Sequence, residues 1–119
     1  MRHISDIVRE RLMADPRMKV CMRNMALRDH VCDGRITFEH ALIYAGRQMD
    51  EVFAIISLCA YSHSVDRFQD NHVYNRQISE WIAINRMTPA DEARYPRGDW
   101  AQRRKHLNGV FGLLTPSVV

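Results

Sequence analysis

The residues that could carry chemistry are concentrated between positions 21 and 63. This stretch holds all three cysteines of the chain and three of its six histidines. They are Cys21, His30, Cys32, His40, Cys59 and His63. Thiolate and imidazole groups are preferred ligands of zinc, and an imidazole can also take a proton from water during hydrolysis. The stretch therefore predicts a metal site, a general base, or both.

The cysteine spacing departs from that of a zinc knuckle, in which two cysteines two residues apart hold the ion from one turn. Cys59 stands where such a pair would begin, but Ser62 occupies the second position, and Cys21 also lacks its second cysteine. Three cysteines can still form a tetrahedral site with one histidine, and His63 or His30 would serve. The alternative is that the cysteines are buried thiols with no special role.

An acidic residue followed by a histidine, Glu39-His40, ends a segment over 35–40 in which apolar and polar residues alternate. Such alternation predicts a short strand, and Asp33-Gly34 before it predicts a tight turn. The apolar segment 51–58 predicts the second strand of a hairpin. We therefore expect His40 at a strand end. It is either a general base or a hydrogen-bonded structural histidine.

Helices are predicted on both sides of this hairpin. Apolar residues over 4–13 recur at helical spacing, and 73–86 carries a partial apolar stripe. Thr88 and Asp99 are typical caps for two C-terminal helices within about 89–112. The predicted fold is α+β and mainly helical. It has a hairpin–helix core over about 21–86, flanked by N- and C-terminal helices, in a single domain over 1–119.

Composition excludes several classes of protein. The chain has 119 residues, of which 46% are hydrophobic and 26% are charged, so it is neither wholly disordered nor collagen-like. No apolar run is long enough to span a membrane. The N-terminus lacks the apolar segment of a signal peptide. We expect a cytoplasmic protein with no membrane partner, in which three cysteines would not build a disulfide framework.

Basic charge is concentrated at the two ends. The net charge is +3, with an excess of +3 in residues 1–25, +3 in residues 96–119, and −3 between them. Basic ends could contact the phosphates of a nucleic acid. The last helix is one candidate for that contact, through Arg103, Arg104 and Lys105. The alternative is that these side chains form the solvated faces of amphipathic helices.

Taken together, these residues resemble the HNH (ββα-metal) nuclease superfamily, in particular small HNH-like proteins encoded by phages and prophages. The resemblance runs from about Cys21 to Gly112. It is carried by Cys-Asp-Gly-Arg-Ile-Thr-Phe-Glu-His-Ala-Leu-Ile-Tyr-Ala-Gly-Arg-Gln over 32–48, by Val-Phe-Ala-Ile-Ile-Ser-Leu-Cys over 52–59, by Asn85-Arg86-Met87-Thr88 and by Leu107-Asn108.

This resemblance implies a metal-dependent DNA endonuclease or nickase. His40 matches the histidine that acts as general base, and His63 matches a residue that binds the catalytic divalent cation, Mg²⁺ or another. Cys21, Cys32 and Cys59 match cysteines that hold a structural zinc. If His63 instead completes the zinc site, it is not available to the catalytic cation in the usual way.

Two departures from the family pattern suggest a different role. Ser62 stands where relatives tend to carry cysteine or histidine, and the middle asparagine of the motif has no secure match. The candidates are Asp50, Asn71 and Asn75, with His72 as a possible further metal-facing histidine. The alternative is therefore a catalytically inactive HNH scaffold, a phage inhibitor whose partner is a host nuclease or defence complex rather than DNA.

Overall fold

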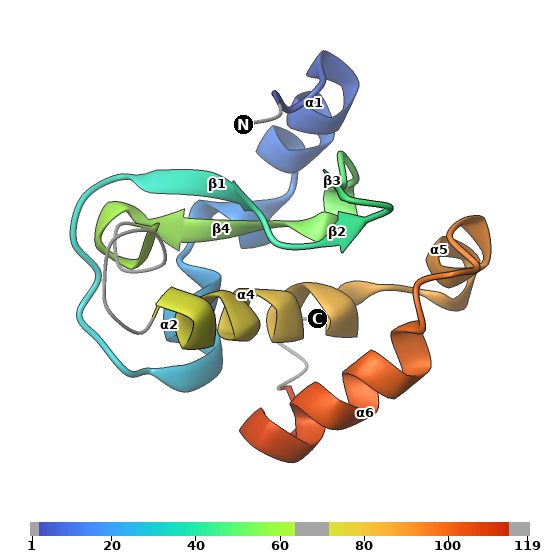
Figure 1. Ribbon diagram of the computed structural model, residues 1–119. Helices are drawn as coiled ribbons and strands as arrows, with labels where there is room; N and C mark the ends of the chain where they lie inside the picture. The colour runs from blue at the N-terminus through green and yellow to red at the C-terminus, as the bar shows by residue number, and fades with distance from the viewer. Residues whose placement is uncertain (1–2, 64–71, 115–119) are drawn as a thin grey trace.

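The computed structural model describes residues 3–63 and 72–114, and the fold over these residues is α+β (Figure 1). Two antiparallel pairs of strands form, β1 with β4 and β2 with β3. The strands are β1 (Ile36–His40), β2 (Ile43–Tyr44), β3 (Arg47–Gln48) and β4 (Ile55–Cys59). The predicted α+β class is confirmed, with His40 as the last residue of its strand.

Helices make up most of the remaining described chain. They are α1 (Asp6–Ala14), α2 (Met22–Leu27), α4 (His72–Arg86), α5 (Pro89–Arg94) and α6 (Trp100–Phe111), with 3₁₀ turns η1 (Pro16–Lys19) and η2 (Val52–Ala54). Thr88 caps α5 as predicted, because its hydroxyl accepts from the amide of Asp91 while the Asp91 carboxylate accepts from the Thr88 amide. The predicted cap at Asp99 is wrong in its mechanism. Asp99 adopts a left-handed conformation, and its side chain makes no capping hydrogen bond.

The structure adds two details to the predicted hairpin. The second strand begins at Ile55, because Val52–Ala54 first forms the turn η2. The segment after His40 contains the small β2–β3 hairpin, whose two central residues have φ values of 52° at Ala45 and 78° at Gly46. Two consecutive positive φ values are typical of the tight turn that joins short antiparallel strands.

The two faces of the β1–β4 pair contact different parts of the chain. Glu39 pairs with Ile56 on one face, and Ser79 of α4 donates to Glu39 at 2.9 Å, so this face lies against α4. On the other face, the Ser57 hydroxyl donates to the carbonyl of Val20, which precedes α2. Because neighbouring residues of a strand point to opposite faces, Glu39 faces α4 and His40 faces the α1–α2 side.

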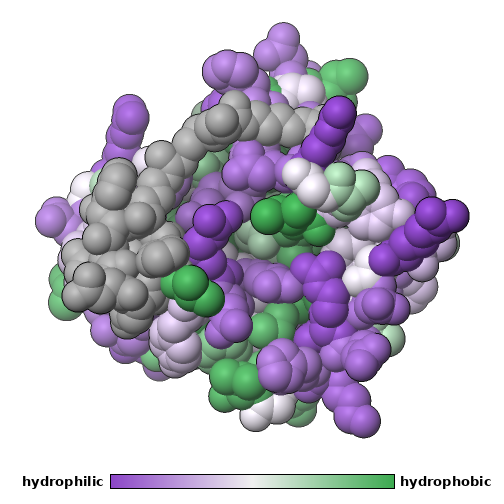
Figure 2. All heavy atoms as spheres, in the orientation of Figure 1, coloured by the Kyte–Doolittle hydropathy of each residue, from purple (hydrophilic) through white to green (hydrophobic). Residues whose placement is uncertain are grey.

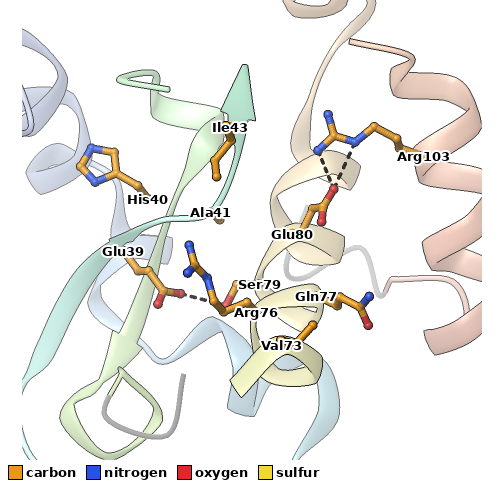
Figure 3. A pocket seen from close by; sticks show the side chains of 10 residues that line it. All are labelled: Glu39, His40, Ala41, Ile43, Val73, Arg76, Gln77, Ser79, Glu80 and Arg103. Atoms are coloured by element: carbon orange, nitrogen blue, oxygen red, sulfur yellow. Dashed lines mark hydrogen bonds and ion pairs between the residues drawn. The ribbon is translucent and has the colours of Figure 1, made fainter. Parts of the chain in front are cut away.

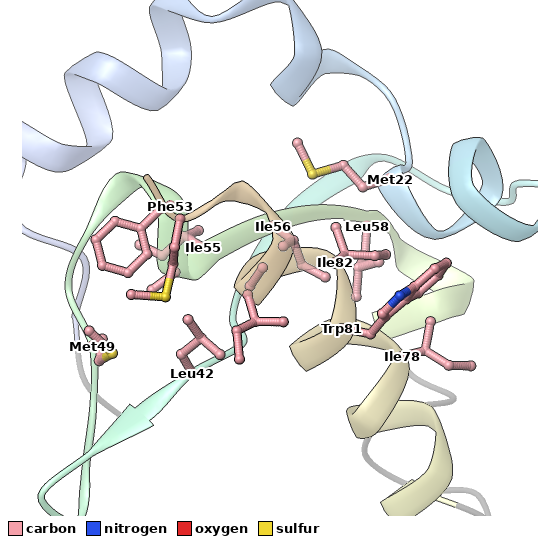
Figure 4. Close-up of a cluster of buried hydrophobic side chains, with 14 of the residues drawn as sticks. Met22, Leu42, Met49, Phe53, Ile55, Ile56, Leu58, Ile78, Trp81 and Ile82 are labelled. Atoms are coloured by element: carbon pink, nitrogen blue, oxygen red, sulfur yellow. The ribbon is translucent and has the colours of Figure 1, made fainter. Parts of the chain in front are cut away.

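The hydrophobic core is centred on β4 and α4 (Figure 4). Every residue of β4 is buried, in contrast to β1, whose residues are partly exposed. From α4, Ile78, Trp81 and Ile82 pack into this cluster. The Trp81 indole nitrogen donates to Asn108 Oδ1 at 3.0 Å, which joins α4 to α6. Among the described residues, no helix is long and apolar enough to cross a membrane.

Candidate metal centre and neighbouring cleft

Three cysteines and one histidine converge near the end of β4. The potential ligand atoms of Cys21, His30, Cys32 and Cys59 all lie within 4.8 Å of one another. His30 Nε2 lies 3.5 Å from Cys59 Sγ and 3.7 Å from the sulfur atoms of the other two cysteines. In a tetrahedral zinc site with the usual bond lengths, a nitrogen and a sulfur ligand are separated by about 3.6 Å. The cluster therefore has the composition and the spacing to bind a metal such as zinc.

Backbone turns bring these four residues together. Arg28 adopts a left-handed conformation with a φ of 51°, which ends α2 and directs the chain toward His30. Gly34 has a φ of +80°, and a Cβ atom there would lie only 2.6 Å from the Cβ of Ala60. Glycine is required for this approach. It lets the loop that carries Cys32 pass against the chain just after β4.

The side chain of Asp29 sets the orientation of the His30 ring. His30 Nδ1 lies 2.8 Å from Asp29 Oδ1. Although burial raises the pKa of Asp29, hydrogen bonds from Arg23 and His30 outweigh it and hold that pKa below its usual value. An ionised carboxylate only accepts hydrogen bonds, so in the neutral form of His30 the hydrogen is on Nδ1 and the lone pair is on Nε2. That lone pair belongs to the nitrogen that faces the three sulfur atoms.

The thiols differ in how readily they lose their protons. Burial would raise the pKa of Cys59, but hydrogen bonds from Ser62 and from the backbone at Asp33 outweigh it and lower the pKa to about 6. Desolvation and the neighbouring sulfur atoms of Cys21 and Cys59 raise the pKa of Cys32 to about 11. Crowded thiolates repel one another. A bound cation would relieve this repulsion.

Ser62 lies inside the cluster without contributing a sulfur or nitrogen ligand. Its hydroxyl oxygen lies 2.9 Å from His30 Nε2 and 3.4 Å from Cys59 Sγ. Its backbone amide donates to Cys59 Sγ at 3.5 Å. Ser62 is buried. These contacts place its hydroxyl at the position that the second thiol of a zinc knuckle would occupy.

The structure separates the two histidines that were alternatives for the fourth ligand. His30 lies among the cysteines, whereas His63 lies beside β1, with its Nδ1 atom 2.7 Å from Thr37 Oγ1. Thr37 shares a strand face with Glu39, which is the face toward α4. The structure thus brings Cys21, Cys32 and Cys59 together as predicted and places His30, not His63, beside them.

A cleft of about 440 Å³ lies between the end of β1 and the first half of α4 (Figure 3). Its lining includes Glu39, His40, Arg76, Ser79, Glu80 and Arg103. Glu80 is paired with Arg103, which donates to it from Nε at 3.1 Å. Arg76 is exposed and extends from α4 toward β1. On the face of the molecule that is seen in Figure 1, hydrophilic side chains predominate (Figure 2).

The two predicted catalytic histidines do not converge in this cleft. The His40 ring points away from Glu39 and Arg76 in Figure 3, as the alternation of the strand requires. His63 lies on the face of the β1–β4 pair opposite to that of His40, where it contacts Thr37. Sequence spacing alone gives no indication of this separation, because it depends on which strand face each residue occupies.

The candidates for the middle asparagine have other contacts. Asp50 accepts hydrogen bonds at 3.2 Å from the amide of Ser5, just before α1. Asn75 is buried and accepts from Arg23 at 3.0 Å. Asn71 and the side chain of His72 lie outside the described residues.

Comparison of the chain with protein-family models, with curated proteins and with solved structures found no match.

Proposed function

We propose that this protein is a zinc-stabilised, HNH-like endonuclease or nickase that acts on DNA. One observation carries the proposal: an antiparallel pair of strands, β1 and β4, is followed along the chain by α4, and the Glu39-His40 pair ends the first strand beside a cleft. This order of elements supports the ββα arrangement that the sequence resemblance implies. The Cys3His cluster would then hold the unit together, as structural zinc sites do in small domains.

The charges of the cleft suit a phosphodiester. The guanidinium of Arg76 can bind a phosphate oxygen through paired hydrogen bonds. The carboxylate of Glu39, held by the Ser79 hydroxyl, is the type of ligand that a hard divalent cation prefers. Such a cation would be held by Glu39, water and the substrate phosphate, and it would stabilise negative charge on that phosphate. For His40 to take the proton from the attacking water in this scheme, its ring must turn toward the cleft, because in the structure it points away from Glu39 and Arg76.

A second candidate function is supported by the placement of the histidines. His40 and His63 face opposite sides of the β1–β4 pair, and among the described residues only the cysteine cluster brings together three or more potential metal ligands. An inactive scaffold that binds a host protein complex would need neither His40 and His63 in one site nor a second cluster of metal ligands. It would keep the zinc centre and the fold while showing no cleavage.

Plasmid nicking distinguishes the two functions. Zinc-loaded protein is assayed with added Mg²⁺, Mn²⁺ or Ni²⁺, beside the variants His40→Ala and Glu39→Gln, all purified in parallel. His106→Ala is the matched control, because His106 is an exposed histidine of α6. The nuclease proposal predicts nicking that both test variants lose and the control keeps. Absence of cleavage from folded protein in every metal, or equal cleavage by His40→Ala, would contradict it and favour the scaffold.

A further inference from the structure

A continuous series of hydrogen bonds leads from the candidate metal ligand His30 to the interior of α4. His30 Nδ1 contacts Asp29 Oδ1 at 2.8 Å, and Arg23 donates to Asp29 Oδ2 at 2.8 Å from Nη2 and at 3.1 Å from Nε. The other terminal nitrogen of Arg23 donates to Asn75 Oδ1 at 3.0 Å. The series joins α2, the loop after it, and α4.

Burial makes these contacts matter to the fold. Asn75 is 2% exposed, and the side chains of Arg23 and His30 are 12% and 10% exposed. A buried polar group that loses its partner destabilises the protein far more than an exposed one. The Arg23 charge is balanced by Asp29 on one side and oriented by Asn75 on the other. None of these side chains can therefore reorient without affecting the next.

The series ends on α4, the helix that lines one side of the cleft. Asn75 faces α2 through Arg23, whereas Arg76 and Ser79 of the same helix line the cleft. Ser79 is the residue that holds the Glu39 carboxylate. The first turns of α4 thus have the metal centre on one side and the cleft on the other, and a change in their position would move both sets of side chains.

We propose that Asp29 and Arg23 are positioning residues that couple metal binding at His30 to the placement of the first turns of α4. A metal bound to Nε2 withdraws electron density from the ring, so Nδ1–H becomes a stronger donor to Asp29. Asp29 then holds Arg23, and Arg23 holds Asn75. Coupling of this kind is reciprocal. If a bound metal strengthens the Asn75 contact by a given factor, the Asn75 contact strengthens metal binding by the same factor, and losing the contact weakens metal binding. The proposal rests on the metal centre and is independent of nuclease activity.

Zinc affinity and amide hydrogen exchange of the full chain test this coupling. Zinc affinity is measured by chelator competition for the wild type, Asp29→Asn and Asn75→Ala, with Asp6→Asn and Gln77→Ala as controls at exposed positions. We expect Asp29→Asn to weaken zinc binding about 10–100-fold. Asn75→Ala should weaken it several-fold, because Asn75 is linked to His30 through Arg23 and Asp29, and both controls should match the wild type. Should Asn75→Ala fail to fold, Arg23→Lys replaces it, because lysine keeps the charge but cannot bridge both partners.

Exchange rates separate coupling from a simple change in affinity. Zinc should slow amide exchange in the first turns of α4 in the wild type. At saturating zinc this protection should be reduced in Asp29→Asn and unchanged in Asp6→Asn. Wild-type zinc affinity in Asn75→Ala, or equal α4 protection in Asp29→Asn and wild type, would overturn the coupling while leaving the metal centre intact. Failure of the wild type to bind zinc would overturn both, whatever the nicking assay shows.

Discussion

The hydroxyl oxygen of Ser62 lies 2.9 Å from Nε2 of His30, which is the ring nitrogen that faces the three cysteine sulfurs. Cys59 and Ser62 have the spacing of a zinc knuckle that lacks its second thiol, and His30 reaches the same place from the loop after α2. A ligand that is absent from one segment is thus supplied by another that lies far away in the sequence. The fourth ligand position can therefore be tested by changing either His30 or Ser62.

Replacing Ser62 with cysteine should rescue a protein that lacks His30. The thiol would stand beside Cys59 in the position of the serine hydroxyl, giving four sulfur ligands without large rearrangement. We expect His30→Ala to weaken Co²⁺ binding and the double variant with Ser62→Cys to restore it. The restored spectrum should show stronger sulfur-to-cobalt charge-transfer bands than the wild type. Ser62→Ala in the His30→Ala background is the control and should restore nothing. Failure of Ser62→Cys to restore binding would place Ser62 outside the ligand sphere.

Zinc binding should tighten as pH rises through neutrality. The pKa of the Cys32 thiol is raised to about 11, so this thiol is protonated at pH 7 and a metal must displace its proton. Each displaced proton makes the apparent affinity about tenfold stronger per pH unit. We therefore expect the zinc Kd to fall at least about tenfold between pH 7 and pH 8, with proton release visible as a buffer-dependent heat in calorimetry. An affinity that is constant over this interval would show that Cys32 is not a ligand.

Much of the fold is predictable from local sequence signals. Alternation over 35–40 predicts β1, and the Thr88 capping box marks the start of α5. The η2 turn and the β2–β3 hairpin are missed because each spans few residues, too short for a periodic pattern. Asp99 precedes α6 as predicted, but its backbone is left-handed and its side chain makes no capping hydrogen bond.

The site is predictable in its residue types but not in its geometry. Metal-ligand chemistry identifies the three cysteines and leaves His30 and His63 as alternatives. The choice between them depends on the left-handed turn at Arg28, which leads to His30, and on the contact of His63 with Thr37 of β1. The contacts of Asp29 with Arg23 and His30 also escape prediction, because an exposed-looking acidic residue in a loop carries no distinctive pattern.

The packing of β4 against α4 should dominate the stability of the protein. Ile56 is fully buried in the core, so Ile56→Ala removes apolar contacts and leaves a cavity. We expect a loss of about 2–5 kcal/mol in the free energy of unfolding. Ile7→Ala is the matched control, because Ile7 is 68% exposed in α1, and it should change stability by less than about 0.5 kcal/mol. Urea unfolding in the presence of chelator measures both, and similar losses in the two variants would contradict this core assignment.

We propose that one metal ion binds to Cys21, Cys32 and Cys59 with His30 as the fourth ligand. The most direct measurement is a side-by-side titration of His30→Ala and His63→Ala with Co²⁺, followed by displacement with zinc. We predict that His63→Ala binds one equivalent with wild-type absorption bands and affinity. His30→Ala should bind far more weakly and with altered d–d bands. Wild-type behaviour of His30→Ala together with loss of binding in His63→Ala would show that His63, not His30, is the fourth ligand.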